Sequence, residues 1–532
     1  MSQTTADTTT PVVVKSDKMP SAIPYIVGNE AAERFNYYGL RAILVTFLVS
    51  QFYLNAAHGD NKLAEDIANT KTHDFVAMSY LLPLFGGMVA DWFWGKYKTI
   101  LVLSIVYCIG NLTLAMTTTN EPFFLGALML IALGAGGIKP CVSANVGDQF
   151  NASNQHLLTK AFSFFYLSIN AGSTLSILLI PYLNKNYGPR VAFGVPAIAM
   201  LIALGFFYAG RNMYVRVMPK PQLNNNKLII FLTAFFSLVV SYVYWFYVAG
   251  KDVGTVGHVL LTWLALVLIL AFVFKKQWFA KPGNFIGISL YALTNGGFKN
   301  AEQEYGPETI DGIKSVWNVL SVFAFIPVFW ALWDQNQSEW IIQATKCDLH
   351  LFGITWQAEQ ISAVNAVFVL AFIPVFSYVI YPALDKAGIK TTPLRRIGTG
   401  FVFTALSFVV IALLQTRIDA GETPTVAWQL LAYVFLTCGE ILIWITALEY
   451  AYTQAPPSMK STIAACGLLT VTVGNVIVAF VHNNSQHKGF FAQFQGASFY
   501  WLFTVICVVT GVLFMFVSPF IKEKSYIGVT EG

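Results

Sequence analysis

A stripe of charged and aromatic side chains opens the first apolar segment of the chain. Residues 30–41 read EAAERFNYYGLR, and the segment then continues as an apolar helix. At 100° per residue, one side of this helix carries the polar side chains of Glu30, Glu33, Arg34, Tyr37, Tyr38 and Arg41. A charge facing mid-bilayer lipid costs about 2.5–3.5 kcal/mol on insertion scales, and this stripe holds four charged residues. The stripe is therefore predicted to face protein or water, where carboxylates can carry protons and guanidinium groups can bind anions.

The elements that must position this stripe are membrane helices. The chain has 532 residues, of which 56% are hydrophobic and 11% charged, whereas a soluble protein would carry about 25% charged residues. Stretches long enough to cross about 30 Å of hydrocarbon predict fourteen helices, starting near residues 24, 74, 99, 122, 161, 191, 228, 257, 316, 361, 397, 428, 461 and 498. The stretches 228–248 and 257–276 lack a polar stripe and are predicted to form a lipid-facing hairpin.

Removing this hairpin leaves two sets of six helices. The predicted fold class is an all-α membrane protein with the major-facilitator architecture, two six-helix bundles whose substrate site lies between them. The predicted parts are a disordered tail (1–22), an N-terminal bundle (23–215), a hairpin with a linker (216–315), a C-terminal bundle (316–522) and a second tail (523–532).

The distribution of Lys and Arg predicts the orientation. With a cytoplasmic N-terminus, inner loops and tails hold 21 of these residues and outer loops hold 8. This asymmetry follows the positive-inside rule, so both termini are expected in the cytoplasm. The protein is expected to be integral to the plasma membrane. Five of the six cysteines lie in apolar segments, and neither metal-ligand nor haem spacing occurs, so no cofactor is expected.

Several sequence blocks resemble the proton-dependent oligopeptide transporter family, whose members belong to the major facilitator superfamily; the overall layout resembles its bacterial members. The ExxERFxYYG motif is complete at Glu30–Gly39. The further blocks are FYLSINAGS at 165–173, GGIKP at 136–140 with DQF at 148–150, FWALWDQ at 329–335 and APPSMKS at 455–461. The loop 86–99, with Asp91 ahead of Lys96 and Lys98, resembles the signature loop of the superfamily and suggests a charged latch.

The resemblance implies a proton-coupled symporter that imports di- and tripeptides by alternating access. Such a carrier needs a clamp for the two charged ends of a peptide. Arg34, Arg41 and Lys139 are expected to bind the peptide carboxylate, and Glu440 the peptide ammonium. The proposed proton-coupling residues are Glu30, Glu33, Arg34, Lys139, His73 and Asp334. The other proposed substrate-binding residues are Tyr38, Tyr80, Tyr166, Asn170, Trp330, Asn365 and Trp444.

Two pairings are expected from depth along the helices. Glu30 or Glu33 lies at a height similar to Lys139, so an ion pair is predicted that protonation of the glutamate would break. His73 and Asp334 are both expected at the outer face, as a gate whose pairing depends on pH. In addition, Trp444 replaces a small residue of the family pattern one turn from Glu440, so it is expected to narrow the pocket.

Other interpretations remain open at this point. Some relatives with the same fold carry nitrate, other anions or small metabolites, so a proton-coupled carrier of nitrate or of a modified peptide is the alternative, although Glu440 favours a zwitterion. A membrane-embedded enzyme is disfavoured because HExxH and GxSxG are absent, and the lack of a Walker sequence argues against direct use of ATP. Sodium remains an alternative coupling ion. The expected partners are a small peptide and the lipid bilayer, without nucleic acid, and the sequence leaves the oligomeric state open.

Overall fold

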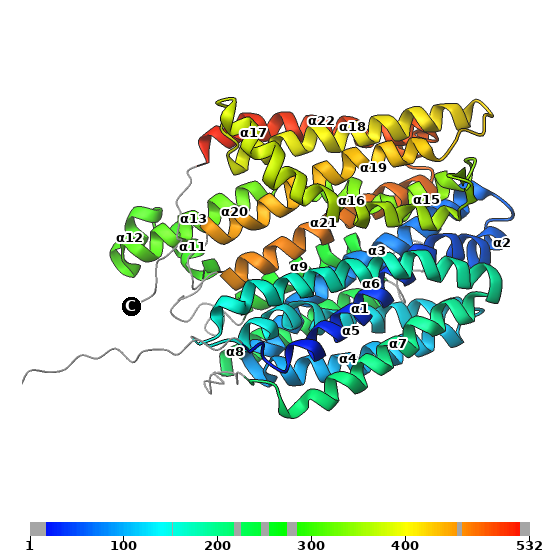
Figure 1. Ribbon diagram of the computed structural model, residues 1–532. Coiled ribbons are helices and arrows are strands. Elements are labelled where there is room, and N and C mark those ends of the chain that lie inside the picture. The colour runs from blue at the N-terminus through cyan, green and yellow to red at the C-terminus, as the bar shows by residue number, and fades with distance from the viewer. Residues whose placement is uncertain are drawn as a thin grey trace, which may run out of the picture.

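The computed structural model describes residues 18–151, 153–216, 225–245, 255–273, 285–454 and 460–521 (Figure 1). Apart from one short β-hairpin, the regular elements of the described chain are helices. Most of both predicted tails, part of the 216–315 segment and residues 455–459 of the APPSMKS block lie outside the described residues.

The first half of the chain forms six long helices. They are α1 (Ile23–Leu48), α3 (Asn61–Val89), α4 (Lys96–Met116), α5 (Glu121–Asp148), α6 (Leu158–Tyr187) and α7 (Pro189–Ala209). The short helix α2 (Leu54–Ala56) follows α1 through a π-helical turn at Val49–Tyr53. The second long helix, α3, starts at Asn61, so the predicted start of the second membrane helix near residue 74 was wrong. Asp60 caps this helix, because its carboxylate accepts the Leu63 backbone N–H at 3.1 Å.

The second half repeats this layout with more interruptions. Its helices are α13 (Pro307–Phe323), α14 (Ile326–Trp333), α15 (Glu339–Ala344), α16 (Ala363–Val375), α17 (Tyr381–Lys386), α18 (Pro393–Asp419), α19 (Ala427–Glu440), α20 (Thr446–Gln454), α21 (Lys460–Gln486) and α22 (Ala497–Val517). Strands β1 (His350–Leu351) and β2 (Ile354–Thr355) pair antiparallel in the loop before α16. Between the halves lie α8 (Asn225–Val243), α9 (Val256–Val273), α11 (Phe285–Thr294) and α12 (Phe298–Tyr305).

Thirteen helical stretches in the described chain are long and apolar enough to cross a membrane. The remaining predicted span corresponds to the shorter apolar stretch Leu228–Val243 in α8. The structure therefore has the predicted class, an all-helical membrane protein.

Glycines permit the closest helix contacts around the site. A Cβ at Gly86 on α3 would lie 2.1 Å from the carbonyl oxygen of Gly136 on α5. Similarly, a Cβ at Gly172 on α6 would lie 2.5 Å from the carbonyl oxygen of Ala31 on α1. These approaches bring the stripe of α1 close to α5 and α6, and only a residue without a side chain allows them.

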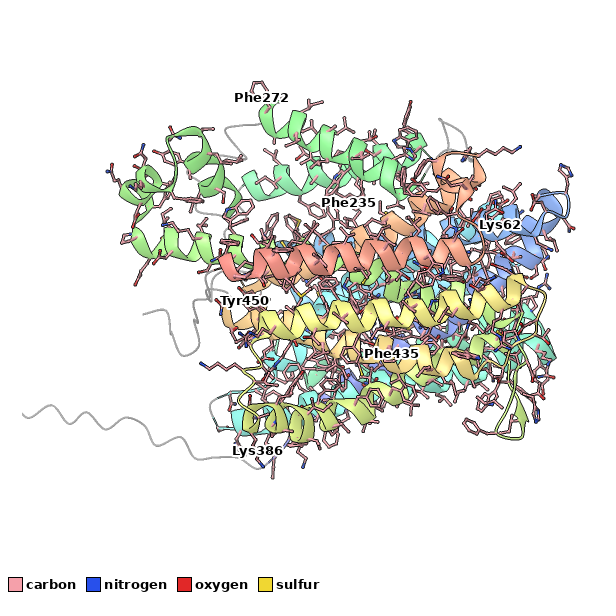
Figure 2. The ribbon with its side chains drawn as sticks, turned by 90° about the horizontal axis from the view of Figure 1, so that it is seen from above. Lys62, Phe235, Phe272, Lys386, Phe435 and Tyr450 are labelled. Atoms are coloured by element: carbon pink, nitrogen blue, oxygen red, sulfur yellow. The ribbon has the colours of Figure 1, made fainter. Side chains whose placement is uncertain are left out.

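The two halves meet along the antiparallel helices α3 and α21. The Thr472 hydroxyl of α21 donates to the Ala77 carbonyl of α3 at 3.2 Å. Nearer the end of the bundle that carries α2 and α15, His73 contacts Asn475 at 2.7 Å (Figure 1). We call this end the α15 end. Figure 2 shows Lys62 at the α15 end and Lys386 and Tyr450 at the opposite end, where α12 lies in Figure 1.

The α8–α9 pair packs on α3. Phe85 of α3 lies against Phe235 of α8 and Trp263 of α9, with ring centroids 5.6 and 5.9 Å away. The Asp74 carboxylate of α3 accepts the backbone N–H of Val256, the first residue of α9, at 2.8 Å. In contrast, Phe272 points away from the bundle (Figure 2). The pair thus has one face on α3 and an exposed apolar face.

Candidate functional site

The α1 stripe is largely buried, and its two glutamates pair with a single arginine. Arg34 Nε lies 2.6 Å from Glu30 Oε1 and 3.1 Å from Glu33 Oε2. Glu30 and Glu33 are 2% and 0% exposed, whereas Arg34 keeps 13% of its side-chain surface open. Two buried carboxylates therefore share one guanidinium, and the charge of the group is −1 unless a proton binds.

Lys139 faces aromatic rings and not the glutamates. Its Nζ lies 3.8 Å from the ring centroid of Tyr37 and 4.2 Å from that of Tyr80, both cation–π distances. Its ammonium makes no hydrogen bond or ion pair with another described residue. The predicted Glu30/Glu33–Lys139 ion pair was wrong for this conformation, because Arg34 is one helical turn from Glu30 and takes the carboxylates first.

A chain of polar contacts links α1, α14 and the segment after it, α21 and α3 at the α15 end. Arg41 Nη2 donates to Asp334 Oδ1 at 2.9 Å, and both residues are 1% exposed. Asn475 donates to Asp334 Oδ2 at 2.7 Å, and its Oδ1 lies 2.7 Å from His73 Nδ1. His73 Nε2 lies 2.9 Å from the Ser338 hydroxyl.

This Arg41–His73 chain corrects the predicted gate in two respects. His73 does not open its helix, since it follows Asn61 by three turns. It also reaches Asp334 through Asn475 and not directly. Asn475 uses its Nδ2 on Asp334 and the Val471 carbonyl, so its Oδ1 must accept the Nδ1–H of His73. Because a serine hydroxyl can donate to Nε2, a neutral His73 ring satisfies both contacts.

Glu440 is the negative pole of the second half. Its Oε2 accepts a hydrogen bond from Asn365 Nδ2 at 2.9 Å, and another from Trp333 Nε1 at 2.9 Å. Trp330 joins this group edge to face, with ring centroids 5.3 Å from Trp333 and 5.0 Å from Trp444. The predicted neighbours Asn365, Trp330 and Trp444 therefore gather around or beside this carboxylate.

Asn170 and Tyr166 stand apart from this hydrogen-bond network. The Asn170 amide donates to the Tyr166 carbonyl of its own helix at 2.9 Å, and so it does not bond Glu440. Tyr166 is 39% exposed on α6. Tyr38 packs edge to face on Tyr37, with centroids 5.7 Å apart. Tyr38 and Tyr80 are both half-buried beside the positive groups.

Three contributing residues were not predicted from the sequence: Trp333, Ser338 and Asn475. Trp333 directly precedes Asp334 in the FWALWDQ block, and this position next to a predicted site residue is a signal for a role in the site. Asn475 is the one amide of the apolar segment 463–481, where a lone buried amide is a signal for a hydrogen-bonded partner on another helix. Ser338 offered no comparable signal.

The charged latch predicted between Asp91 and the basic turn of Lys96 and Lys98 is not formed in this structure as predicted. Lys96 pairs with Asp148 at the end of α5, at 2.7 Å, so the basic turn of the signature loop does not close on Asp91. This contact fastens α4 to α5 within the first half.

The arrangement can hold a small molecule with two opposite charges. Lys139 and the Arg34 group supply positive charge from the first half, and Glu440 supplies negative charge from the second. The Arg34 and Glu440 side chains are partly exposed and border accessible space, whereas the Nζ of Lys139 is buried against the two tyrosine rings. Buried carboxylates that share a cation are also suited to accept a proton.

Comparisons with known proteins agree with this geometry. The family model described as "POT family" matches residues 97–495. The chain is similar to the solved structure of the POT family transporter PepTSo, with 34% identity, a TM-score of 0.79, and coverage of 94% of this chain and 98% of that one. Another solved proton dependent oligopeptide (POT) family transporter shows 35% identity and a TM-score of 0.73, covering 92% of this chain and all of that one.

The comparison with curated sequences is more limited in length. Human solute carrier family 15 member 1 is 34% identical over 425 residues, which are 75% of this chain and 52% of that protein. The chain thus spans about half the length of the curated relatives that it matches.

Proposed function

Because this chain belongs to the POT family of proton-dependent oligopeptide transporters, we propose that it is a symporter that imports di- and tripeptides together with protons. The family is one of transporters, which excludes the membrane-embedded enzyme considered from the sequence. The observation that carries the proposal is that Tyr38 of α1 lies within electrostatic range of both Arg34 in the first half and Glu440 in the second, so groups of opposite charge from the two halves flank one side chain.

The proposed orientation puts the α15 end outside the cell. The positive-inside distribution then places both termini in the cytoplasm of a plasma-membrane protein. The bundles 23–215 and 316–522 act as the two rocking halves, joined by the segment 216–315. With α3 and α21 in contact at the α15 end, this conformation is closed to the outside.

In the proposed binding mode, a peptide bridges the halves. Its carboxylate binds Lys139 and Arg34, with Arg41 close by on the same helix. Its ammonium binds Glu440, whose second oxygen has no hydrogen bond to Asn365 or Trp333. Tyr38, Tyr80, Tyr166, Trp330 and Trp444 border the peptide as amphipathic surfaces that accept many side chains, with Asn170 as a polar neighbour.

Proton coupling follows from the shared guanidinium. While Glu30 and Glu33 are both ionised, they compete with a peptide carboxylate for Arg34. A proton on one glutamate removes one competing charge and makes the group neutral, so Arg34 becomes available to the peptide. Proton binding and peptide binding then strengthen each other by the same factor. No cofactor takes part beyond the proton.

Uptake of labelled dialanine into proteoliposomes tests the proposal. With an inward proton gradient, accumulation is expected, and unlabelled di- and tripeptides should block it whereas free alanine should not. Replacing sodium by potassium should leave uptake unchanged, because protons are the coupling ion. Uptake that requires sodium, or no uptake of dialanine in any condition, would contradict the proposal.

The second candidate is a proton-coupled carrier of nitrate or a modified peptide. The position of Trp444 favours a restricted substrate, because its ring lies 5.0 Å from Trp330 beside the Glu440 group. Uptake by two variants, W444A and E440Q, distinguishes the two candidate functions. A variant with W444A should accept bulkier dipeptides if the site binds peptides, whereas an anion carrier needs no ammonium site and should keep its uptake after E440Q.

A further inference from the structure

A second histidine joins the two halves at the α15 end, outside the site described above. His482 of α21 lies with Nδ1 2.8 Å from Asp66 Oδ1 of α3 and with Nε2 2.8 Å from Glu339 Oε1 of α15. Lys62 lies 2.7 Å from Asp66 Oδ1, and the Ser485 hydroxyl donates to Asp66 Oδ2 at 2.9 Å. We call these five residues the His482 cluster.

The cluster repeats the geometry of the His73 contact two turns along the same helices. His73 and Asp66 are seven residues apart on α3, and Asn475 and His482 are seven residues apart on α21. Two cross-links of similar spacing therefore join α3 to α21. They differ in chemistry, because His73 faces an amide and a hydroxyl whereas His482 faces two carboxylates.

The contacts of His482 require an additional proton. A neutral imidazole has one N–H, and its other nitrogen carries a lone pair. An ionised carboxylate only accepts, so an unprotonated Nε2 at 2.8 Å from Glu339 Oε1 would meet a negative charge with no compensating proton. Two carboxylates at this distance from the two nitrogens are therefore both favourable when the ring is the doubly protonated imidazolium.

Charge balance leads to the same conclusion. With Lys62 positive and both carboxylates ionised, the cluster has a charge of −1 around a neutral ring and of zero around an imidazolium. His482 is 1% exposed and Asp66 2% exposed, so an unbalanced charge here would be costly. Asp66 of α3 and Glu339 of α15 contact the ring, and His73 of α3 lies within electrostatic range of it. The charged and titratable groups next to these two carboxylates are Lys62 and Glu65 of α3, Lys346 after α15 and Tyr500 of α22.

We propose that His482 is a proton-binding site of the gate at the α15 end, which takes up a proton when the halves close and releases it when they separate. Separation moves Asp66 and Glu339 away from the ring, and water then solvates all three groups. A state that holds a proton which the other state lacks is favoured as the pH falls, by up to tenfold per pH unit for one proton. One part of this proposal rests on the proposed function: the assignment of the α15 end to the outside of the cell, from which the proton would then arrive.

Nitrogen-15 NMR of histidine-labelled protein in nanodiscs tests the protonation state directly. At pH 7.5, the signal that disappears in H482Q is expected to be that of an imidazolium, with both nitrogens protonated. H487Q is the matched control, because His487 lies just after α21 at the same end of the bundle, and its Nδ1 contacts the Asn483 carbonyl. If the signal lost in H482Q is that of a neutral ring, the proposal is overturned.

A distance measurement tests the link to the gate. The six native cysteines are first replaced, and cysteines for spin labels are then introduced at the exposed positions Asn55 and Gln493. The distance between the two labels reports the separation of the halves at the α15 end. Between pH 6 and 9 the population with the longer distance should grow, and H482Q should remove this pH response while H487Q keeps it. D66N provides a second variant if H482Q folds poorly. An unchanged pH response in H482Q or in D66N would overturn the proposal, whereas failed peptide uptake alone would contradict only the proposed function.

Discussion

At the scale of single residues, burial of charge decides the chemistry. The stripe on α1 could be predicted because four charges in an apolar helix must avoid lipid. The partners of Glu30 and Glu33 could not be predicted, because side-chain conformations decide whether Arg34 or Lys139 comes within hydrogen-bond distance of the carboxylates. The i,i+4 spacing of Glu30 and Arg34 favours their pairing in hindsight. The neutral amide Asn475 was missed because nothing in a single sequence marks its partner 402 residues away.

The glutamates of α1 yield the first prediction. E30Q combined with E33Q should abolish proton-driven accumulation of dialanine while retaining peptide exchange without a gradient, because Gln can occupy the site but cannot ionise. Gradient-driven uptake should fall at least tenfold. The control is E449Q, since Glu449 is 56% exposed and lies 3.6 Å from Arg396, remote from the stripe. Accumulation that persists in the double variant would contradict the assigned coupling.

Trp333 yields the second prediction. W333F keeps an aromatic ring but removes the hydrogen bond from Nε1 to Glu440. A hydrogen bond to a charged group contributes about 1.5–3 kcal/mol, so the position of Glu440 should loosen and KM for dialanine should rise by roughly tenfold. W94F, at an exposed tryptophan, is the control in the same uptake assay. An unchanged KM would mean that Glu440 does not need this donor.

At the scale of elements, hydropathy predicted the type and number of helices well but their ends poorly. The stretch 61–73 holds Lys62, Glu65, Asp66 and Lys71, so it did not look like a membrane helix. In the structure it extends α3, because Asp66 pairs with Lys62 and with His482 of α21, and Glu65 pairs with Lys346, which follows α15. The start of α3 was therefore fixed by tertiary contacts, which hydropathy does not include.

Gly86 yields a prediction about helix packing. G86A should lower the melting temperature in detergent, because the new Cβ would lie 2.1 Å from the Gly136 carbonyl oxygen and must push α3 from α5. Overpacking of this kind costs about 1–3 kcal/mol. G126A is the matched control, since Gly126 on α5 has open space around its Cβ position. Equal melting temperatures for the two variants would contradict the close approach.

At the scale of the whole molecule, the sequence predicted two bundles and a site between them but not the conformation. Which end is closed depends on contacts between halves that are distant in the chain, such as Arg41 with Asp334. Only one of the partners of Asp334, Arg41, stood out in the sequence. The pairing of α3 with α21 could not be predicted, because the polar residues that join them, such as His73 with Asn475 and Asp66 with His482, lie about 400 residues apart and a single sequence does not match them to each other.

Asp334 yields the prediction at this scale. D334N should open the α15 end, because Arg41 would lose its anionic partner while 1% exposed. Breaking one side of a buried ion pair costs about 3–5 kcal/mol, enough to change the dominant conformation. The population with a long distance between labels at Asn55 and Gln493 should rise, and D385N, at an exposed aspartate, should have no effect. A closed distance in D334N would contradict this assignment.

The attachment of α9 to α3 has a practical consequence. The Asp74 carboxylate that accepts the Val256 N–H directly follows His73 in the chain, so α9 is tied to the helix that carries the gate. Residues on the outer face of α9, such as Phe272 at 76% exposure, lie outside the proposed peptide-binding site, yet they must move with α3. An environment-sensitive dye attached there would act as an optical sensor of turnover in single molecules, without modification of the substrate path.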